Sequence, residues 1–482
     1  MKECKIIIKD EVNVKFHGLP VEVRRKLMKQ FEYEKAGAKY IPSVKFGRWN
    51  GKISYFSLAG STYINLLDEI IPYLVENDYD IEIEDQRNSK ELSFELVSED
   101  TFSDTKWPTG HPAAGSPIKL RDYQVEIINN FLANPQSLQE VATGAGKTII
   151  TAALSQCIEK YGRSLVIVPN KSLVVQTEAD YINLGLDVGV YFGDRKEYGK
   201  THTICTWQSL NNILKRDKTD DMSLDDFFFD GVAGIIVDEV HMAKADVLKS
   251  MLTGIFSNIP IRWGLTGTIP KDKMDQVSLL VSLGPVVGKL GAKELQDKGV
   301  LANCHVNIIQ IKDNKEFANY QSELKHLLED ERRLEKMASL VTEISKSGNT
   351  LVLLDRVNAG KELVSRLDNA VFVNGNTKLT ERKEEYDEVA TSDDKIIVAT
   401  YGVAAVGINI PRIFNLVLIE PGKSFVRVIQ SIGRGIRKAE DKDFVQIWDL
   451  TSNCKYSKRH LTQRKAFYKE AEYPYSIEKM DL

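Results

Sequence analysis

The chain has 482 residues, of which 43% are hydrophobic and 27% are charged, and its formal net charge at pH 7 is −4. This composition excludes a disordered or collagen-like protein, and the length predicts about three domains. The near-neutral charge excludes a uniformly basic surface, so any contact with nucleic acid must be a local basic patch.

The five cysteines lie far apart in the sequence, and none forms a CxxC pair. This spacing argues against a disulfide framework or a structural zinc site and favours a reducing compartment. No apolar run reaches the ~20 residues of a membrane span, and the amino-terminal charges recur too soon for a secretory signal. We therefore expect a cytoplasmic protein with no membrane contact.

Residues 1–113 show a mixed pattern that predicts a small α+β domain. The expected strands are Lys5–Phe16, Ser43–Lys45, Lys52–Phe56 and Asp80–Glu84, and the expected helices are Val21–Phe31 and Asn65–Glu76. The segment Thr105–Pro117 is rich in Pro, Gly and Ala, which disfavour regular structure, and is predicted to be a linker.

From Leu120 onward, short uninterrupted apolar strands alternate with helical stretches. Such strands predict parallel sheets that are covered by helices on both faces. The expected strands of the first cycle are Ser164–Val168, Thr203–Cys205, Gly234–Val237 and Arg262–Leu265, and those of the second are Val306–Ile311, Thr350–Leu354, Ala370–Val373, Lys395–Ala399 and Leu416–Ile419. We predict two α/β domains, at residues 114–302 and 303–482.

The segment Val141–Thr148 reads VATGAGKT and is followed by the apolar run Ile149–Leu154. A Gly-rich loop that opens a helix points backbone N–H groups and the positive end of the helix dipole at an anion. Lys147 is expected to reach the β/γ-phosphates of a nucleotide, and Thr148 is expected to bind Mg²⁺. The expected phosphate-binding residues are Ala142, Thr143, Gly144, Ala145, Gly146, Lys147 and Thr148. Val141 replaces the first Gly of the general pattern, and the alternative reading is an ordinary Gly-rich turn.

An acidic pair, Asp238 and Glu239, follows the apolar strand Gly234–Val237. Carboxylates at the carboxyl end of a parallel strand lie where ligands bind in open α/β sheets. Asp238 suits Mg²⁺, and Glu239 suits polarisation of the attacking water. Alone, such a pair is usually a solvated strand end, but the upstream phosphate loop favours the catalytic interpretation.

These segments and several others resemble, in order, the motifs of superfamily 2 helicases of the DExH kind. The further matching segments are Leu120–Gln124, Val168–Leu173, Cys205–Leu210, Leu265–Thr268, Thr400–Pro411 and Gln430–Arg437. The resemblance implies two tandem RecA-like motor domains that hydrolyse ATP with Mg²⁺. It places Arg121 and Gln124 near the adenine, Asn409 near the ribose, and Lys171, Thr206, Gln208 and Thr400 on a nucleic-acid backbone.

The last of these segments carries Gln430, Arg434 and Arg437 at spacings of four and three, which can share one face of a helix. The alternative is a solvated basic face, although Gly433 and Gly435 are poor choices for a merely structural helix. The resemblance implies that Arg434 and Arg437 meet the γ-phosphate in the transition state and that Gln430 senses it.

In the amino-terminal domain, the segment Lys45–Lys52 reads KFGRWNGK. Arg48 and Trp49 suit contact with a phosphate and stacking on a base, and a β-hairpin with the Trp in a small core is an equal alternative. The segment is similar to a hairpin of the phage UvsW helicase family, with Asn50 in place of the family's Asp. The resemblance implies unwinding or branch migration of branched DNA, such as forks and Holliday junctions, in phage recombination, repair and replication.

Three other functions stay open at this point. The same motor is compatible with an RNA-remodelling helicase or with the duplex translocase subunit of a restriction or remodelling complex. The third alternative is a non-enzymatic binding module that is switched by a nucleotide. Glu239, Arg434 and Arg437 argue against it, because such a switch does not need the full set of hydrolytic residues. The basic stretch Lys455–Lys469 is either a solvated helix face or a surface that contacts a nucleic-acid backbone.

Overall fold

The computed structural model describes the chain except for residues 1, 89–90, 108–113, 198, 217–228, 243–244, 314, 378, 404–409, 411, 425–427, 429–430 and 434. The chain divides into two compact units, which are described separately below. One comprises residues 1–140 and 146–289, and the other comprises residues 141–145 and 290–482. Among the helices in the described ranges, none has the length and apolar character needed to cross a membrane.

The amino-terminal part of the first unit is a four-stranded sheet with helices, in the strand order β5-β2-β1-β6. Its elements are β1 (Lys2–Ile8), β2 (Asn13–His17), α1 (Val21–Gln30), β3 (Glu32–Glu34), η1 (Ala38–Tyr40), α2 (Pro42–Lys45), β4 (Lys52–Ser54), β5 (Ser61–Tyr63), η2 (Ile64–Leu66), α3 (Leu67–Glu76) and β6 (Tyr79–Asp85). β1 pairs antiparallel with β2 and parallel with β6, and β3 pairs with β4 as a separate ribbon. The result is the small α+β domain that the pattern predicts.

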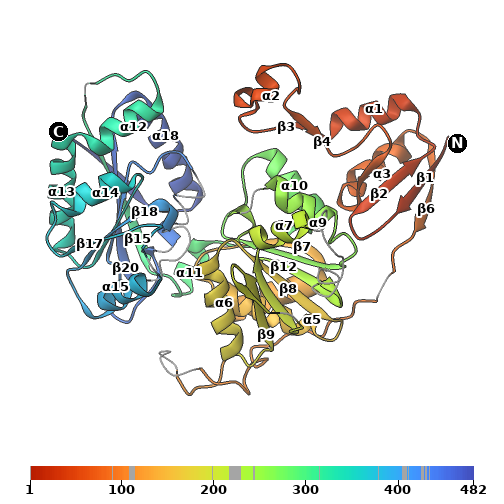
Figure 1. The fold of residues 1–482 in the computed structure, drawn as a ribbon, viewed down its shortest axis with the longest axis horizontal. Coiled ribbons are helices and arrows are strands. Elements are labelled where there is room, and N and C mark those ends of the chain that lie inside the picture. Colours follow the sequence, from red (N-terminus) through yellow and green to blue (C-terminus); the bar gives the residue numbers. More distant parts are fainter. Residues whose placement is uncertain are drawn as a thin grey trace. The chain divides into compact units, whose positions relative to one another are not determined.

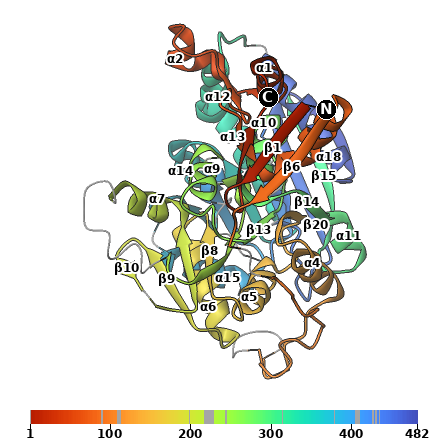
Figure 2. The same cartoon turned by 90° about the vertical axis from the view of Figure 1, so that its right-hand side faces the viewer.

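The remainder of the first unit is an eight-stranded sheet in the order β10-β9-β11-β8-β12-β13-β7-β14. Its strands are β7 (Gln136–Val141), β8 (Arg163–Val168), β9 (Val188–Phe192), β10 (Arg195–Lys196), β11 (His202–Thr206), β12 (Val232–Val237), β13 (Ile261–Thr266) and β14 (Val286–Leu290). Its helices are α4 (Asp122–Ala133), α5 (Lys147–Ile158), α6 (Lys171–Asn183), α7 (Trp207–Arg216), η3 (Val240–Met242), α9 (Ala245–Thr253) and α10 (Lys273–Leu283). Helices α7 and α9 lie on one face of the sheet, and α5 and α6 lie on the other (Figures 1 and 2).

Helix α10 joins the two parts of the first unit. Its side chains Met274, Val277 and Val281 belong to the same buried apolar cluster as the core of the amino-terminal domain. Tyr55 reinforces this packing, because its hydroxyl lies 2.5 Å from Ser278 Oγ and donates to the carbonyl of Met274 at 3.2 Å. The amino-terminal domain is therefore packed directly on the first large sheet's helical layer.

The second unit is built on a seven-stranded sheet in the order β17-β18-β16-β19-β20-β15-β21, and all of its strand pairs are parallel. Its strands are β15 (Asn303–Ile311), β16 (Thr350–Leu354), β17 (Ala370–Val373), β18 (Ile396–Thr400), β19 (Asn415–Ile419), β20 (Phe444–Ser452) and β21 (Tyr475–Met480). Its helices are α11 (Ala292–Asp297), α12 (Tyr320–Glu329), α13 (Glu331–Ser345), α14 (Val357–Val364), α15 (Leu379–Thr391) and α18 (Lys455–Glu470). The first large sheet, parallel except for the antiparallel pair of β9 and β10, and the parallel second sheet confirm the predicted tandem α/β fold.

Two predictions in the amino-terminal domain are wrong. The predicted single strand Lys5–Phe16 is a hairpin, β1 and β2, whose turn is fixed by Asp10 Oδ1, which accepts hydrogen bonds from the N–H groups of Val12 and Asn13. The predicted strand Ser43–Lys45 lies in helix α2, because Pro42 occupies its first turn, where its missing N–H costs nothing. The partner of β4 is β3 rather than residues 43–45.

Candidate nucleotide and nucleic-acid site

The carboxyl ends of five neighbouring strands meet at one edge of the first large sheet. In the parallel register, Thr206 lies opposite Val168, Val237 lies opposite both Ile167 and Gly264, and Thr266 lies opposite Glu140. The loops that follow β7, β8, β11, β12 and β13 therefore share this edge, which is the edge where open α/β sheets bind ligands. Five of the segments that were singled out in the sequence lie in these loops.

The predicted phosphate loop connects β7 to α5. Gly144 and Gly146 have φ angles of +93° and +80°, a left-handed conformation that favours glycine. Gly146 caps the amino terminus of α5, and no side chain makes a capping hydrogen bond there. Lys147 and Thr148 open the helix, so their backbone lies at its positive end.

Gln124 lies directly against this loop. A Cβ atom at Gly146 would lie 2.6 Å from Gln124 Nε2, so glycine is required for the close approach. Gln124 is buried, and its Oε1 accepts the backbone N–H of Arg121 at 2.9 Å. The guanidinium of Arg121 donates to the Tyr123 hydroxyl at 2.8 Å. The predicted adenine-reading residues and the phosphate loop are thus neighbours in the structure.

Lys147 and Glu239 form a short ion pair, with Nζ and Oε1 2.5 Å apart and the side chains 10% and 11% exposed. Glu239 has a left-handed backbone, with φ at +50°. Its second oxygen accepts the backbone N–H of Gly267 at 3.3 Å and lies 3.5 Å from His241 Nδ1. His241 Nδ1 also lies 2.7 Å from Thr266 Oγ1. Lys147 and Glu239, which are 92 positions apart in the chain, are therefore in contact. The segment Leu265–Thr268 contacts Glu239 through Gly267 and His241 through Thr266.

The two neighbouring carboxylates have opposite pKa shifts. Burial raises the pKa of Asp238 to about 6, and the nearby Glu239 carboxylate adds to the rise. Burial also acts to raise the pKa of Glu239, but the Lys147 ammonium and His241 outweigh burial and hold this pKa at about 2. Glu239 is consequently the ionised partner of Lys147 at neutral pH.

The residues at this edge fit a magnesium nucleotide. Thr148 supplies a hydroxyl and Asp238 a carboxylate, which are oxygen donors of the kind that Mg²⁺ prefers. The helix terminus and Lys147 supply positive charge for phosphate oxygens. Within the described ranges, no group of three or more acidic, His or Cys side chains is suited to hold another metal.

The predicted strand-contacting residues of the first unit lie at the same edge. Lys171 is the exposed first residue of α6, and Gln208 Nε2 reaches the carbonyl of Pro169 at 3.4 Å, so the loops after β8 and β11 touch. Thr206 is buried, and its hydroxyl lies 2.9 Å from that of Ser209. In the second unit, Thr400 is the half-buried last residue of β18.

Of the predicted γ-phosphate residues, only Arg437 lies in the described part of the chain, since Gln430, Arg434 and the predicted ribose contact Asn409 lie outside it. Arg437 is not on a helix, so the shared helical face is wrong for this residue. It pairs as an isolated β-bridge with Leu301. Lys442, which directly follows the next turn, is buried and donates to the carbonyl of Gly435 at 2.8 Å. Burial, together with Arg437, lowers the pKa of Lys442 to about 7.

The amino-terminal segment Lys45–Lys52 is an exposed loop after α2. Its backbone is held by the carbonyl of Ser43, which accepts the N–H groups of Arg48 at 2.8 Å and of Trp49 at 3.1 Å. Arg48 is exposed, whereas Trp49 is half-buried and its indole donates to the carbonyl of Lys52 at 3.0 Å. Phe46, the other aromatic residue of the segment, is 74% exposed and is also suited to stack on a base.

Three family models match the chain. They are the amino-terminal domain of DNA helicase UvsW over residues 5–84, the res subunit of type III restriction enzymes over residues 117–271, and the helicase conserved C-terminal domain over residues 332–439. This domain composition is that of an ATP-dependent DNA helicase and confirms the class predicted from the motifs. Within that class, the amino-terminal match confirms the predicted resemblance to the UvsW family.

Similar proteins agree with this assignment. The ATP-dependent DNA helicase uvsW of Enterobacteria phage T4 is 24% identical over 459 residues, which cover 91% of this chain and 88% of that protein. The DNA 3'-5' helicase XPB of Kineococcus radiotolerans is 24% identical over 74% of this chain and 64% of its own length. The structure of the ATP-dependent Type ISP restriction-modification enzyme LlaBIII bound to DNA is 17% identical, with a TM-score of 0.56 over 87% of this chain and 36% of that one. The last similarity concerns the fold alone.

Proposed function

We propose that this protein uses ATP hydrolysis to unwind or branch-migrate branched DNA, such as forks and Holliday junctions, during phage recombination, repair and replication. In this proposal, residues 1–113 are an accessory DNA-binding region, residues 114–302 bind ATP, and residues 303–482 form the second motor domain. The protein would act in the host-cell cytoplasm if it is phage-encoded. The observation that carries the proposal is the contact of Lys147, Glu239 and Gly267 at an edge shared with Lys171 and Gln208.

The proposed chemistry assigns one task to each side chain. Lys147 and the amino terminus of α5 hold the β- and γ-phosphates, and Gln124 with Arg121 lies near the base. Glu239 orients and polarises the attacking water, because its low pKa keeps it ionised at neutral pH. Mg²⁺, held by Thr148 and Asp238, would neutralise charge on the phosphate oxygens.

The second motor domain supplies positive charge to the transition state. Arg437 and Arg434 are proposed to meet the γ-phosphate, Gln430 to sense it, and Asn409 to lie near the ribose. An arginine in this role contributes ~10³–10⁵ to the rate in related phosphoryl-transfer enzymes. Loss of the γ-phosphate removes the electrostatic partner of the two arginines. The contacts of the motor domains with DNA can therefore alternate with each cycle of hydrolysis.

In the proposal, ATP hydrolysis is coupled to the DNA contacts through Glu239. Its carboxylate accepts the N–H of Gly267, and His241 contacts Thr266, so the catalytic carboxylate is bonded to the loop between β13 and α10. A change at the γ-phosphate can therefore be transmitted to Thr266–Thr268 and to helix α10. In the proposal, this loop couples hydrolysis to the strand-contacting residues Lys171, Thr206, Gln208 and, in the second domain, Thr400.

The proposal is tested by ATPase and unwinding rates on four-way junctions, forked DNA, linear duplex and RNA at one salt concentration. We expect the strongest stimulation and strand separation on branched DNA. Stimulation by RNA alone would favour the RNA-remodelling alternative. Equal ATPase stimulation by linear duplex without strand separation would favour a duplex translocase.

A further inference from the structure

A cavity of about 660 Å³ lies in the second unit, away from the residues assigned above. It is bounded by the segment after β15 and by the start of α18, and its lining residues are Asp313, Lys315, Glu316, Phe317, Asn453, Cys454, Lys455, Lys458, Arg459 and Thr462. β15 and β20 are neighbouring parallel strands, with Ile311 opposite Ser452. The cavity therefore opens at the carboxyl edge of the second sheet.

One wall of the cavity is a basic face of α18. Lys455, Lys458, Arg459 and Thr462 follow the spacing i, i+3, i+4 and i+7, which places them on one face of the helix. All four side chains are exposed. Within the described part of the chain, the three cations form no ion pair, and Lys455 Nζ lies 5.7 Å from the Tyr456 ring centre. Their positive charge is available to a ligand.

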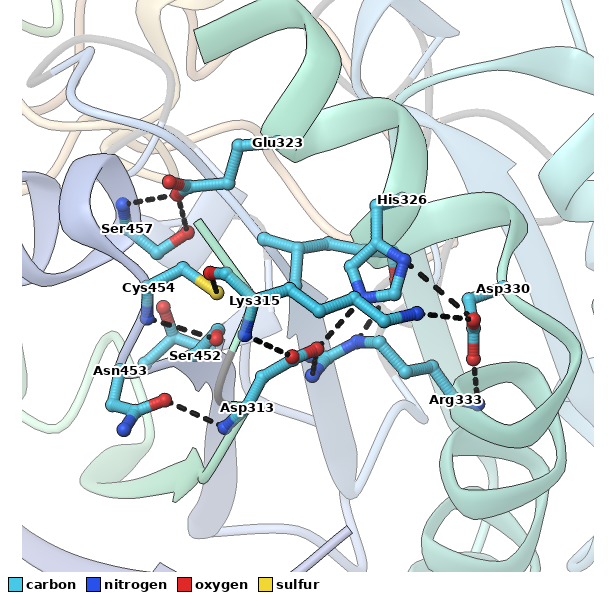
Figure 3. A network of polar contacts seen from close by, with 12 residues as sticks. Asp313, Lys315, Glu323, His326, Asp330, Arg333, Ser452, Asn453, Cys454 and Ser457 are labelled. Carbon is cyan, nitrogen blue, oxygen red and sulfur yellow. Dashed lines mark hydrogen bonds and ion pairs between the residues drawn. The ribbon is translucent and has the colours of Figure 1, made fainter. Parts of the chain in front are cut away.

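Asp313, which lines the cavity, is already paired with His326 and Arg333 (Figure 3). Asp313 Oδ2 lies 2.7 Å from His326 Nε2 and accepts from Arg333 Nη1 at 3.3 Å. Lys315 donates to Asp330 at 3.4 Å, so its charge is partly used as well. Glu316 is exposed at the rim and is the remaining acid of the lining. The positive charge that the cavity presents to a ligand therefore comes from the side chains of α18.

Helix α18 is held firmly, and its amino terminus is not the binding group. The buried carboxylate of Glu323 accepts the backbone N–H of Ser457 at 2.7 Å (Figure 3) and that of Tyr456 at 3.0 Å. The Ser457 hydroxyl also donates to Glu323 at 2.9 Å. These bonds pair two backbone N–H groups of the first turn within the protein, so we assign recognition to the side chains on the basic face.

The cavity shares its sheet edge with Thr400. Strands β18 and β20 are three positions apart in the order β18-β16-β19-β20, which is about 14 Å at ~4.8 Å per strand. A DNA strand in helical form spans this distance in about four nucleotides at 3.4 Å each. One strand that runs along the edge from Thr400 can therefore reach the basic face.

We propose that this cavity binds the phosphodiester backbone of a DNA strand and extends the DNA track of the second motor domain. The inference rests on the proposed function, since it requires that the protein bind DNA. Lys455, Lys458 and Arg459 contact phosphates without reading bases, as expected for a motor that moves along any sequence. The Thr462 hydroxyl on the same face donates to the carbonyl of Lys458 at 3.1 Å, so the three cations make these contacts.

The test compares two lysine pairs of the second unit in the full-length protein. Lys455→Ala with Lys458→Ala changes the cavity, and Lys336→Ala with Lys346→Ala removes the same charge from α13 and its carboxyl-terminal cap, which do not line the cavity. Binding of a fluorescein-labelled single-stranded oligonucleotide is followed by anisotropy over a series of KCl concentrations. We expect the cavity variant to bind more weakly and to lower the slope of log affinity against log salt by about 1.4, at ~0.7 per phosphate. The control should keep the wild-type slope.

Four further results complete the test. Lys455→Arg with Lys458→Arg should restore the slope, and unchanged melting temperatures exclude loss of folding. Equal slopes for the cavity variant and the wild type, with DNA binding intact, would overturn this inference and leave the proposed function standing. A wild-type protein that does not bind DNA would overturn both.

Discussion

The edge of the first sheet and the loop after α2 both carry cations that are proposed to meet phosphate, but their surroundings differ. Lys147 is 10% exposed and lies 2.5 Å from Glu239, whereas the side chain of Arg48 is exposed on the loop after α2. A charge acts strongly in a water-excluded site and weakly in solvent, where salt screens it. The buried site is therefore suited to catalysis, and the exposed loop to modest, salt-dependent discrimination between DNA shapes.

The largest effect should come from the buried pair. Lys147→Ala should reduce ATP turnover to background, because a phosphate contact is lost. Glu239→Gln should lower kcat by about 10⁴-fold while ATP binding persists, because the water loses its base. Glu178→Gln, which weakens the ion pair of a similarly buried glutamate with Arg195, is a matched control that should keep wild-type turnover. Wild-type kcat in Glu239→Gln would remove the catalytic assignment.

The next effect concerns the arginines of the second unit. Arg437→Ala and Arg434→Ala should each lower kcat by about 10³-fold with a smaller change in nucleotide affinity, because the charge is needed in the transition state. Steady-state kinetics and binding of a labelled nucleotide separate the two quantities. Lys438→Ala removes an adjacent exposed cation and should change neither. A change in affinity alone would contradict the transition-state role.

A smaller effect is expected where the amino-terminal domain packs on α10. Val281→Asp puts a carboxylate into the shared apolar cluster and should lower the free energy of unfolding by about 3 kcal/mol or more. Val175→Asp, on the exposed face of α6, should change it by less than about 0.5 kcal/mol. Denaturant unfolding measures both. Equal stabilities would show that the packing contributes little.

The smallest effect should come from the exposed loop. Arg48→Ala with Trp49→Ala, and Phe46→Ala separately, should lower the ratio of junction to linear-duplex affinity, with stacking worth ~1–3 kcal/mol per base. Because Trp49 is half-buried and Phe46 is 74% exposed, Phe46→Ala should have the larger stacking effect. Both losses should shrink at higher salt if phosphate contacts dominate. An unchanged ratio at fixed salt would place branch preference in the motor.

Deletion of residues 1–113 is a less direct test of the same idea. We expect measurable ATPase without branch preference, but the deletion also uncovers Met274, Val277 and Val281 on α10. It further removes Phe94, whose ring packs against Trp263 in the first large sheet. Point substitutions in the loop avoid both effects.

The sequence predicted the parallel sheets well because their strands are uninterrupted apolar runs, and β16 and β17 match the predicted bounds. It did not predict β7 or β20, which contain polar residues. Gln139 is buried in β7 and donates to the carbonyl of Ile127, and Asp449 in β20 is buried against Arg464 and Tyr468. Such partners lie 12 to 19 positions away, so no local pattern shows them.

The same limit applies to the site. The types and order of the motif residues predicted one site, and the structure brings the segments that carry them to one edge of the first large sheet. The contact of Lys147 with Glu239 joins residues 92 positions apart, and the role of His241 as a bridge to Thr266 depends on the register of β12 and β13. The exposure of Phe46 likewise follows from α2, a helix that was predicted to be a strand.

The packing of the amino-terminal domain on α10 has a consequence for avidity. When two binding modules are joined by a flexible linker, chain entropy sets the effective concentration of the second contact. Here Tyr55, Ser278 and the shared apolar cluster hold the two modules together. The effective concentration of the second contact is therefore set by geometry, and little conformational entropy is lost on binding. A branched DNA that reaches both the loop and the sheet edge gains two weak contacts at once, while a linear duplex that reaches one gains only one. Shape selection of this kind needs no base to be read.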